Sequence, residues 1–170
     1  AFKQLEIHID CLRDEKTGLF YHGYHCNKKE HMGQIWGRGN GWVVAALSRL
    51  IPILENKGYN MDKYKSVFVR AMDSAYKNRL ENGMLRTLIT DNEAYKEMSA
   101  SMLFGYAALN GTESKLLPEK YLLWAKQIEK CVEYDDSEWI KYISAGTNPQ
   151  GREGYLDRPY IEANYGHGIA

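Results

Sequence analysis

Residues 36–52 read WGRGNGWVVAALSRLIP, a glycine-rich approach followed by an apolar segment. Asn40 is a residue type that caps helices, and apolar residues then recur at three- and four-residue intervals, at positions 43, 44, 47, 50 and 51. This spacing predicts a helix that begins after Asn40 and buries one face. Pro52 lacks a backbone N–H, so we expect it to stop or kink that helix.

Four more segments carry helical spacing, at residues 2–14, 60–80, 93–109 and 118–132. Asn60 is the expected cap of the second of these, Asn110-Gly111 the end of the third, and Pro118 the opening residue of the fourth. Residues 84–89 form a short apolar run that we interpret as a loop. No strand-rich block competes with these helices, so the predicted fold class is all-α.

Two long segments rich in glycine and aromatic residues, 14–41 and 137–165, separate the helices. Connections of this length are uncommon in compact domains unless they are functional or disordered. Long loops alternate with short ones, which favours helical hairpins whose long loops gather at one end. Side chains from such loops can converge on a pocket there.

Charge and composition limit the classes of partner. Lysine plus arginine and aspartate plus glutamate each total 22, without a block of either sign, so nucleic acid and anionic membranes are not expected partners. The most apolar stretch, 42–54, is shorter than the roughly 20 residues of a membrane span. The 170 residues suit one domain or part of one. Three cysteines, an odd number, argue against a disulfide framework and favour the cytoplasm, with the periplasm as the alternative.

Several motifs recur in a recognisable order: LFYHGY at 19–24, WGRGNGW at 36–42, DNEAYKEMSA at 91–100, SAGT at 144–147, and RPY at 158–160 ahead of His167-Gly168. Together they resemble the glycoside hydrolases that act on unsaturated uronyl and rhamnogalacturonyl sugars, family 105 and the related family 88. The resemblance covers essentially the whole chain. It implies the C-terminal part of an (α/α)6 toroid of six helical hairpins, so that residues 1–170 are a partial domain truncated at both ends.

The resemblance places His22, Trp36, Arg38 and Trp42 at the sugar, and we expect them to converge on one concavity. Flat aromatic faces beside a planar cationic donor near a helix N-terminus suit a sugar carboxylate. The alternative interpretation is that both tryptophans belong to the core and that Arg38 pairs with a structural carboxylate.

The segment 144–147 offers backbone amides and a hydroxyl, so Gly146 and Thr147 are predicted to form a polar wall of the pocket. An ordinary turn is the alternative. Glu97, with Ser99 and Ser101, falls inside the expected 93–109 helix, and there a solvated or hydrogen-bonded structural role is expected.

A compact set of potential metal ligands lies at His22, His25, Cys26 and His31. Its spacing matches no zinc pattern, so no metal and no cofactor are assigned. His25 departs from the family, which commonly has an acidic residue after the His-Gly-aromatic element.

The resemblance implies hydration of a vinyl ether: an aspartate protonates C4 of a 4,5-unsaturated uronic acid, activates water toward C5, and the resulting hemiketal releases the neighbouring sugar. In the family that aspartate lies in the N-terminal half, upstream of this chain, so no catalytic residue is assigned here. Asp10 lies on a plain helix. The implied partners are a small oligosaccharide and the N-terminal half of the same polypeptide. A non-catalytic carbohydrate-binding remnant and a sugar epimerase or isomerase are the alternatives.

Overall fold

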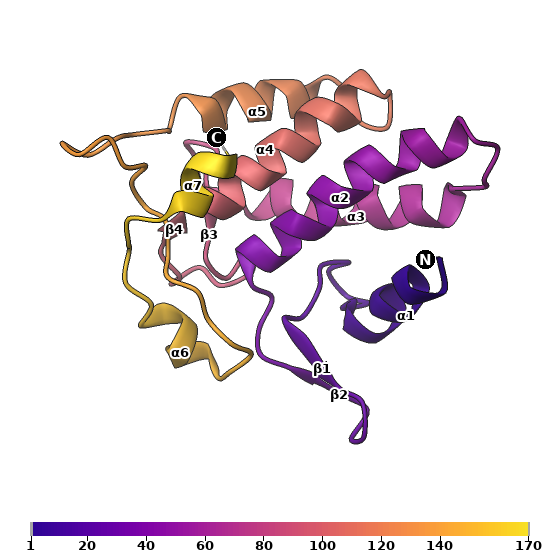
Figure 1. Cartoon of the computed structure of the whole chain (residues 1–170), viewed down its shortest axis with the longest axis horizontal. Coiled ribbons are helices and arrows are strands. Elements are labelled where there is room, and N and C mark those ends of the chain that lie inside the picture. Colours follow the sequence, from indigo (N-terminus) through magenta and orange to yellow (C-terminus); the bar gives the residue numbers. More distant parts are fainter. Residues whose placement is uncertain (1, 170) are drawn as a thin grey trace.

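The structure is a computed structural model that describes residues 2–169. Its elements, shown in Figure 1, are α1 Phe2–Leu12, β1 Gly23–His25, β2 Glu30–Met32, α2 Gly37–Glu55, α3 Asp62–Asn78, β3 Leu85–Arg86, β4 Lys96–Glu97, α4 Met98–Glu113, α5 Lys120–Glu129, α6 Arg152–Leu156 and α7 Asn164–Ile169. The strands form two short antiparallel pairs, β1 with β2 and β3 with β4. The expected all-α class is confirmed.

The helices pack in two layers. Helices α2 and α4 form one layer and pack extensively on each other, although α3 separates them in sequence. Helix α7 also packs on α4. Helices α3 and α5 form the other layer, where the rings of Tyr76 and Tyr121 lie 5.2 Å apart. The main hydrophobic core lies between the layers and includes Leu47, Phe68 and Phe104. Layers of alternating helices are the arrangement of a six-hairpin toroid.

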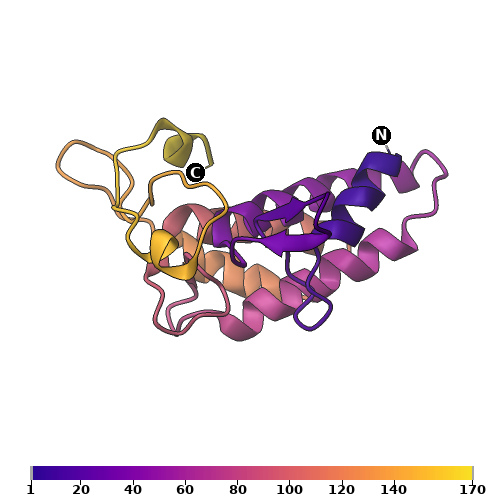
Figure 2. The same ribbon diagram turned by 90° about the horizontal axis from the view of Figure 1, so that it is seen from below.

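The connections differ at the two ends of the helices. The short links 56–61 and 114–119 lie at one end, while the long segments 79–97 and 130–163 gather at the other, where α6 and α7 also lie (Figures 1 and 2). Isolated bridges pair Leu88 of the segment 79–97 with Trp36, just before α2, and pair Ser144 with Tyr160 within the segment 130–163. The predicted gathering of long loops at one end is therefore present, and it places the N-terminal ends of α2, α4 and α7 together.

The start of α2 differs from the prediction. The helix begins at Gly37 with Trp36 as its N-cap, so Asn40 lies inside the first turn and does not cap it. The Asn40 amide instead accepts from the Phe20 N–H at 2.7 Å and donates to the Phe20 oxygen at 2.8 Å. Asn40 therefore fastens the segment before β1 to α2, a contact that local spacing does not reveal.

The expected stop at Pro52 and the expected helix end at Asn110-Gly111 are wrong, while a kink at Pro52, the other expectation there, stays a prediction. Helix α2 continues through Pro52 to Glu55, because a proline three residues from the end removes only the bond to the Ser48 carbonyl. Helix α4 runs past Asn110-Gly111 to Glu113. A Cβ at Gly111 would lie 2.7 Å from Cδ1 of Leu117, so this glycine serves close packing and does not terminate the helix.

Smaller differences concern element bounds. Helix α3 follows Met61 at the N-cap, while the Asn60 side chain accepts from the Asp62 N–H at 2.9 Å. Helix α5 is shorter than predicted at both ends. Part of the expected loop 84–89 forms β3. Among the described residues, no helix combines the length and the apolar character that crossing a bilayer requires.

Candidate functional site

Glycines allow α2 to begin in close contact with its neighbours. A Cβ at Gly37 would lie 2.7 Å from the Arg86 carbonyl oxygen, and one at Gly41 would lie 2.7 Å from Cβ of Leu103. Real Cβ atoms essentially never approach that closely, so larger residues would push α2 away. The glycine-rich sequence thus sets the first turns of α2 against the segment before α4 and against α4 itself.

Arg38, in the first turn of α2, joins three segments of the chain. Its side chain is buried, and Nη1 donates to Ser99 Oγ at 3.0 Å and to the backbone carbonyl oxygen of Ser144 at 2.9 Å. Nη2 donates to the Ala145 oxygen at 3.0 Å. The Glu97 carboxylate lies 3.4 Å from Nη1. Of the two interpretations of Arg38, pairing with a structural carboxylate is present in the structure, and its contact with substrate stays a prediction.

Glu97 is the buried partner and the N-cap of α4. Its carboxylate accepts from the Ala100 N–H at 2.6 Å, from Ser99 Oγ and from the Ser144 N–H at 3.0 Å. A carboxylate at this position satisfies free amides and complements the helix dipole. Of the two roles expected for Glu97, the hydrogen-bonded structural role is confirmed and the solvated one is wrong, because its side chain is buried. The sequence offered one signal for this burial, since Glu97 directly precedes a run without charged residues, 98–112.

Aromatic rings surround the Arg38 guanidinium. Its Cζ atom lies 4.7 Å from the Trp36 ring and 4.8 Å from that of Tyr165, in the first turn of α7. The Tyr165 hydroxyl donates to the Ser144 oxygen at 2.6 Å. Sequence reasoning missed Tyr165, because nothing local ties residue 165 to residue 38. The starts of α2, α4 and α7 therefore meet around one guanidinium.

His22 completes the cluster. Its ring lies 4.5 Å from the Trp36 ring, and its Nδ1 lies 2.7 Å from the Tyr155 hydroxyl. Burial, and secondarily the charge of Arg38, lower the pKa of His22 from its ordinary value of 6.5. The imidazole is therefore neutral at pH 7 and can bond a polar ligand atom without carrying charge.

The segment 144–147 lies against Arg38 through its first two carbonyl groups. Gly146 is exposed, with no atom within 4 Å of an added Cβ, and the Thr147 hydroxyl donates to the Asn148 oxygen at 3.2 Å. Gln150 also hydrogen-bonds the Thr147 hydroxyl. The structure therefore places Gly146 and Thr147 beside the cluster, and their contact with sugar stays a prediction.

Trp42 lies apart from the other predicted site residues. It is 53% exposed and lines an apolar groove of about 310 Å³ with Leu5 and Ile9 of α1. It sits one helical turn beyond Arg38, farther from the gathered loops. The expected convergence therefore brings together His22, Trp36 and Arg38 but not Trp42, whose role in sugar binding stays a prediction.

The histidines of the β1–β2 hairpin have other partners. The His31 ring stacks on Tyr21 at 4.2 Å, while His22 bonds Tyr155. Across residues 2–169, no group of three or more histidine, cysteine, aspartate or glutamate side chains is placed to hold a metal ion.

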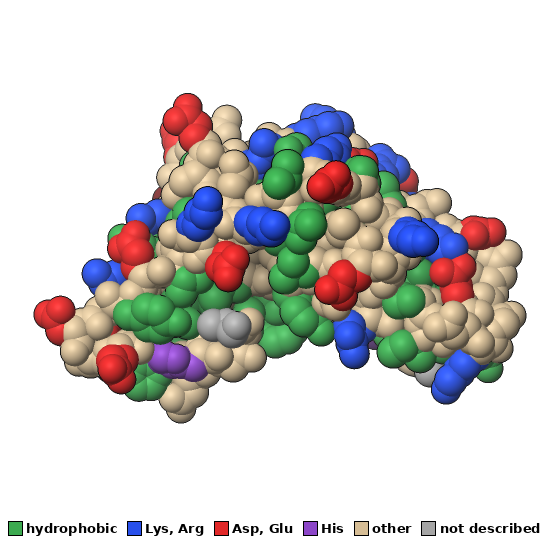
Figure 3. All heavy atoms as spheres, turned by 90° about the horizontal axis from the view of Figure 1, so that it is seen from above, with side chains coloured by type: hydrophobic (Ala, Val, Ile, Leu, Met, Phe, Trp, Pro, Cys, Tyr) green, Lys and Arg blue, Asp and Glu red, His purple; other side chains and the backbone are tan. Residues whose placement is uncertain are grey.

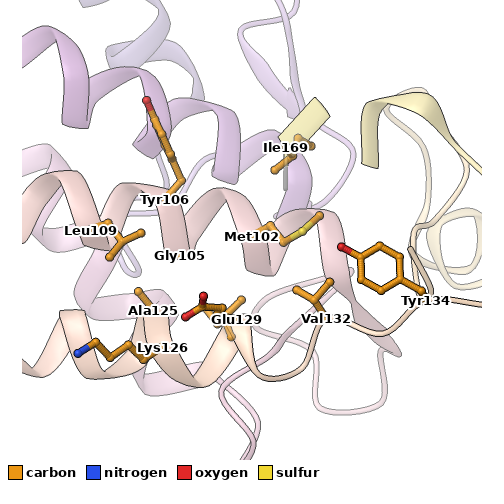
Figure 4. A pocket seen from close by; sticks show the side chains of 11 residues that line it. Met102, Gly105, Tyr106, Leu109, Ala125, Lys126, Glu129, Val132, Tyr134 and Ile169 are labelled. Atoms are coloured by element: carbon orange, nitrogen blue, oxygen red, sulfur yellow. The ribbon is translucent and has the colours of Figure 1, made fainter. Parts of the chain in front are cut away.

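A second groove, larger than the one beside Trp42, lies away from this cluster. It has a volume of about 630 Å³ and runs between α4 and α5, where mostly apolar side chains face one another, with Tyr134 and Ile169 toward one end (Figure 4). Hydrophobic side chains gather in the middle of this face, between scattered charged groups (Figure 3). No set of polar groups converges in it, so it does not resemble a sugar site.

The sequence model of Glycosyl Hydrolase Family 88 matches residues 1–170. The chain therefore belongs to glycosyl hydrolase family 88.

Two curated relatives and one solved structure are similar to this chain. Unsaturated rhamnogalacturonyl hydrolase YesR of Bacillus subtilis (strain 168) is 28% identical over 173 residues, which cover 100% of this chain and 49% of the relative. Unsaturated 3S-rhamnoglycuronyl hydrolase of Formosa agariphila is 26% identical over 71% of this chain and 34% of its own length.

The solved structure shows the fold alone. A protein of Salmonella enterica serovar Paratyphi A, described as a possible member of the GH105 family, superposes with a TM-score of 0.91 at 22% identity. The match covers 99% of this chain and 46% of that one. The chain thus spans about half the length of YesR, since 49% of that relative is covered.

Proposed function

We propose that this chain supplies part of the sugar pocket of a hydrolase that removes a 4,5-unsaturated uronyl residue from rhamnogalacturonan-type oligosaccharides. The observation that carries the proposal is the cluster of His22, Trp36 and Arg38 at the joined starts of three helices, in a chain of a glycoside hydrolase family. The names of these two relatives, which concern unsaturated sugars, support the substrate class.

The chemistry of the cluster fits an anionic, hydroxyl-rich ligand. Helix N-termini carry partial positive charge; Glu97 already caps α4, but the start of α2 lies beside Trp36 and Arg38, so a carboxylate is favoured there. His22 is neutral and bonds a sugar oxygen, while exposed edges of Trp36 and Tyr165 contact the ring. Gly146 and Thr147 close one side with backbone amides and a hydroxyl.

Arg38 has two proposed roles. In the first it contacts the sugar carboxylate, but there it competes with Glu97, which already balances its charge. In the second it positions the 144–147 wall through the Ser144 and Ala145 carbonyl groups. Arg38→Lys separates the roles, because lysine keeps the charge and loses the planar fork. If Arg38 binds the carboxylate, the variant loses discrimination between the uronate and its methyl ester. If it only positions the wall, both substrates lose turnover equally.

The proposed reaction is hydration of the vinyl ether. An aspartic acid adds a proton to C4 of the double bond, its carboxylate takes a proton from water as the oxygen adds to C5, and the hemiketal opens to release the neighbouring sugar. Ordinary glycosidases use two carboxylates across the glycosidic bond. Asp10 on α1 is exposed and pairs with Lys63 at 3.4 Å, and in the family that the motifs resemble the acid lies in the N-terminal half, so we propose that the acid lies outside these residues.

The test compares the 170-residue chain alone with the polypeptide that also includes any sequence encoded in frame upstream of residue 1. The substrate is an unsaturated galacturonyl-rhamnose disaccharide, and the readout is loss of ultraviolet absorbance of its conjugated double bond. We expect turnover only in the longer polypeptide, because a positioned acid contributes about 10² to 10⁴-fold. Turnover by the chain alone would overturn the placement of the acid. Binding without turnover in both proteins would favour a carbohydrate-binding remnant.

We also propose a cytoplasmic location, with the periplasm as the alternative. Cys11, Cys26 and Cys131 are free thiols in the described chain, which is typical of a reducing compartment. Fractionation of cells that express the native gene tests this location.

A further inference from the structure

The β1–β2 hairpin carries His22 at its base, next to Gln34. The backbone N–H of His22 donates to the backbone carbonyl oxygen of Gln34 at 3.0 Å, so the two residues continue the pairing of the strands. The Tyr155 hydroxyl reaches both residues from α6, since it lies 2.7 Å from His22 Nδ1 and accepts from the Gln34 N–H at 3.3 Å. A buried tyrosine on a distant helix thus contacts a proposed sugar-binding histidine.

Which partner donates in the Tyr155–His22 bond follows from the surroundings of Tyr155. Its side chain is completely buried, so its single O–H must find an acceptor within the protein. The backbone N–H of Gln34 donates to the hydroxyl oxygen at 3.3 Å, so Gln34 cannot accept the Tyr155 proton. His22 Nδ1, at 2.7 Å, can accept it, and the O–H therefore donates to Nδ1.

We propose that Tyr155 is a positioning residue of the sugar site, which donates to Nδ1 of His22 and holds this imidazole as the tautomer protonated on Nε2. His22 then presents a hydrogen-bond donor to its ligand, and the sugar atom that it contacts must be an acceptor oxygen. The inference rests on the proposed function for the ligand, but the tautomer itself does not depend on it. Sequence distance hides the pair, since 133 residues separate its members.

Other contacts hold the Tyr155 hydroxyl in place. Gly33 has a positive φ of 74°, and a Cβ there would clash with the hydroxyl oxygen. Helix α6 is fastened by Arg152, whose Nε donates to Asp91 at 2.6 Å, and by Tyr95, whose hydroxyl donates to the Tyr155 carbonyl at 3.3 Å. The position of Tyr155 therefore depends on these contacts as well as on its own ring.

The direct test is ¹⁵N nuclear magnetic resonance of the imidazole nitrogens in the protein that carries this chain, with the His22 signals assigned by loss in His22→Gln. We expect an unprotonated Nδ1 and a protonated Nε2 at neutral pH. In Tyr155→Phe this preference should be lost, and the pKa of His22, which faces Arg38 and Tyr155, should rise. A protonated Nδ1 in the unmodified protein would overturn the proposal, without any variant or substrate.

Two controls separate the hydroxyl from general damage to α6. Tyr95→Phe removes a hydroxyl that supports α6 but does not touch His22, so the His22 tautomer should persist. His31, stacked on Tyr21, should keep its signals in every variant. Equal changes at His22 in Tyr95→Phe and Tyr155→Phe would contradict the assignment.

Kinetics distinguish failure of this inference from failure of the proposed function. If both hold, Tyr155→Phe raises KM by about two- to tenfold, as expected for one neutral hydrogen bond, and shifts the acid limb of the pH profile to higher pH. If the tautomer is as expected but His22→Gln leaves KM unchanged, the sugar-binding role of His22 fails while the positioning of its ring stands.

Discussion

Two arginines of this chain pair with carboxylates in opposite surroundings. Arg38 is 5% exposed and faces Glu97, which is completely buried, at the meeting of three helix starts. Arg152 is 35% exposed and lies within 2.6 to 2.8 Å of Asp91, Glu93 and Glu153, of which the two glutamates are mostly exposed. The surface pairs are shorter, yet we expect the longer buried pair to matter far more. Water replaces a lost surface partner, whereas a buried charge left alone has nothing to replace it.

The largest expected effect comes from breaking the buried pair. Arg38→Ala leaves the Glu97 carboxylate without its cation and should lower the free energy of unfolding by about 3–5 kcal/mol, measured by denaturant titration. Arg49→Ala is the matched control, because Arg49 is exposed on the same helix. A loss no greater than that of the control would contradict the structural role of Arg38.

Neutralising Glu97 should lower the free energy of unfolding by less than removing the Arg38 side chain does. Glu97→Gln keeps the shape of the N-cap but weakens its bonds to Ser99 and to the Ala100 N–H, so we expect a loss of about 1.5–3 kcal/mol. The same titration measures it. A double variant, Arg38→Met with Glu97→Gln, should lose less than the sum of the single changes, because neither charge is then left alone. Strict additivity would show that the two side chains act independently.

Protonation of His22 should change the free energy of unfolding by a still smaller amount, and it should lower it. Its folded-state pKa lies below the ordinary 6.5, because burial and then the Arg38 charge disfavour the proton. The unfolded chain therefore binds more protons below about pH 6.5, and stability falls as the pH drops through that region. His22→Gln should flatten this part of the stability curve, measured by denaturant titration at a series of pH values. An unchanged curve for His22→Gln would assign the pH dependence to other groups.

The smallest effect is expected at the surface network. Arg152→Ala should lower the melting temperature only slightly, and the difference should shrink in 1 M salt, where exposed charges are screened. The comparison is made by calorimetry at low and high salt. A large loss that persists in salt would mean that α6, and with it Tyr155, depends on Arg152 more than the exposure of the network suggests.

The sequence predicted the helices and the alternation of long and short connections because both are local properties. Apolar residues at three- and four-residue intervals specify which face of α2, α3 and α5 is buried, whatever those faces contact. The motif around Trp36 and Arg38 likewise indicated a site at a helix start. The spacing did not predict the true start of α2 or the passage of α2 through Pro52. Asn40 was free to bond Phe20, and the last turn tolerates one missing amide.

The tertiary structure alone decided which residues share the site. Arg38 contacts Glu97 and Ser144, which lie 59 and 106 residues away in sequence, and His22 contacts Tyr155, 133 residues away. No periodicity links such positions, because hydrogen bonds and ring contacts between distant segments depend on how the long loops fold over the helix ends. The same reason separates Trp42 from its neighbours in sequence, since one further turn of α2 carries it to the groove beside α1. The sequence by itself thus determined the helices and the family, and the packing of three helix starts determined which side chains meet.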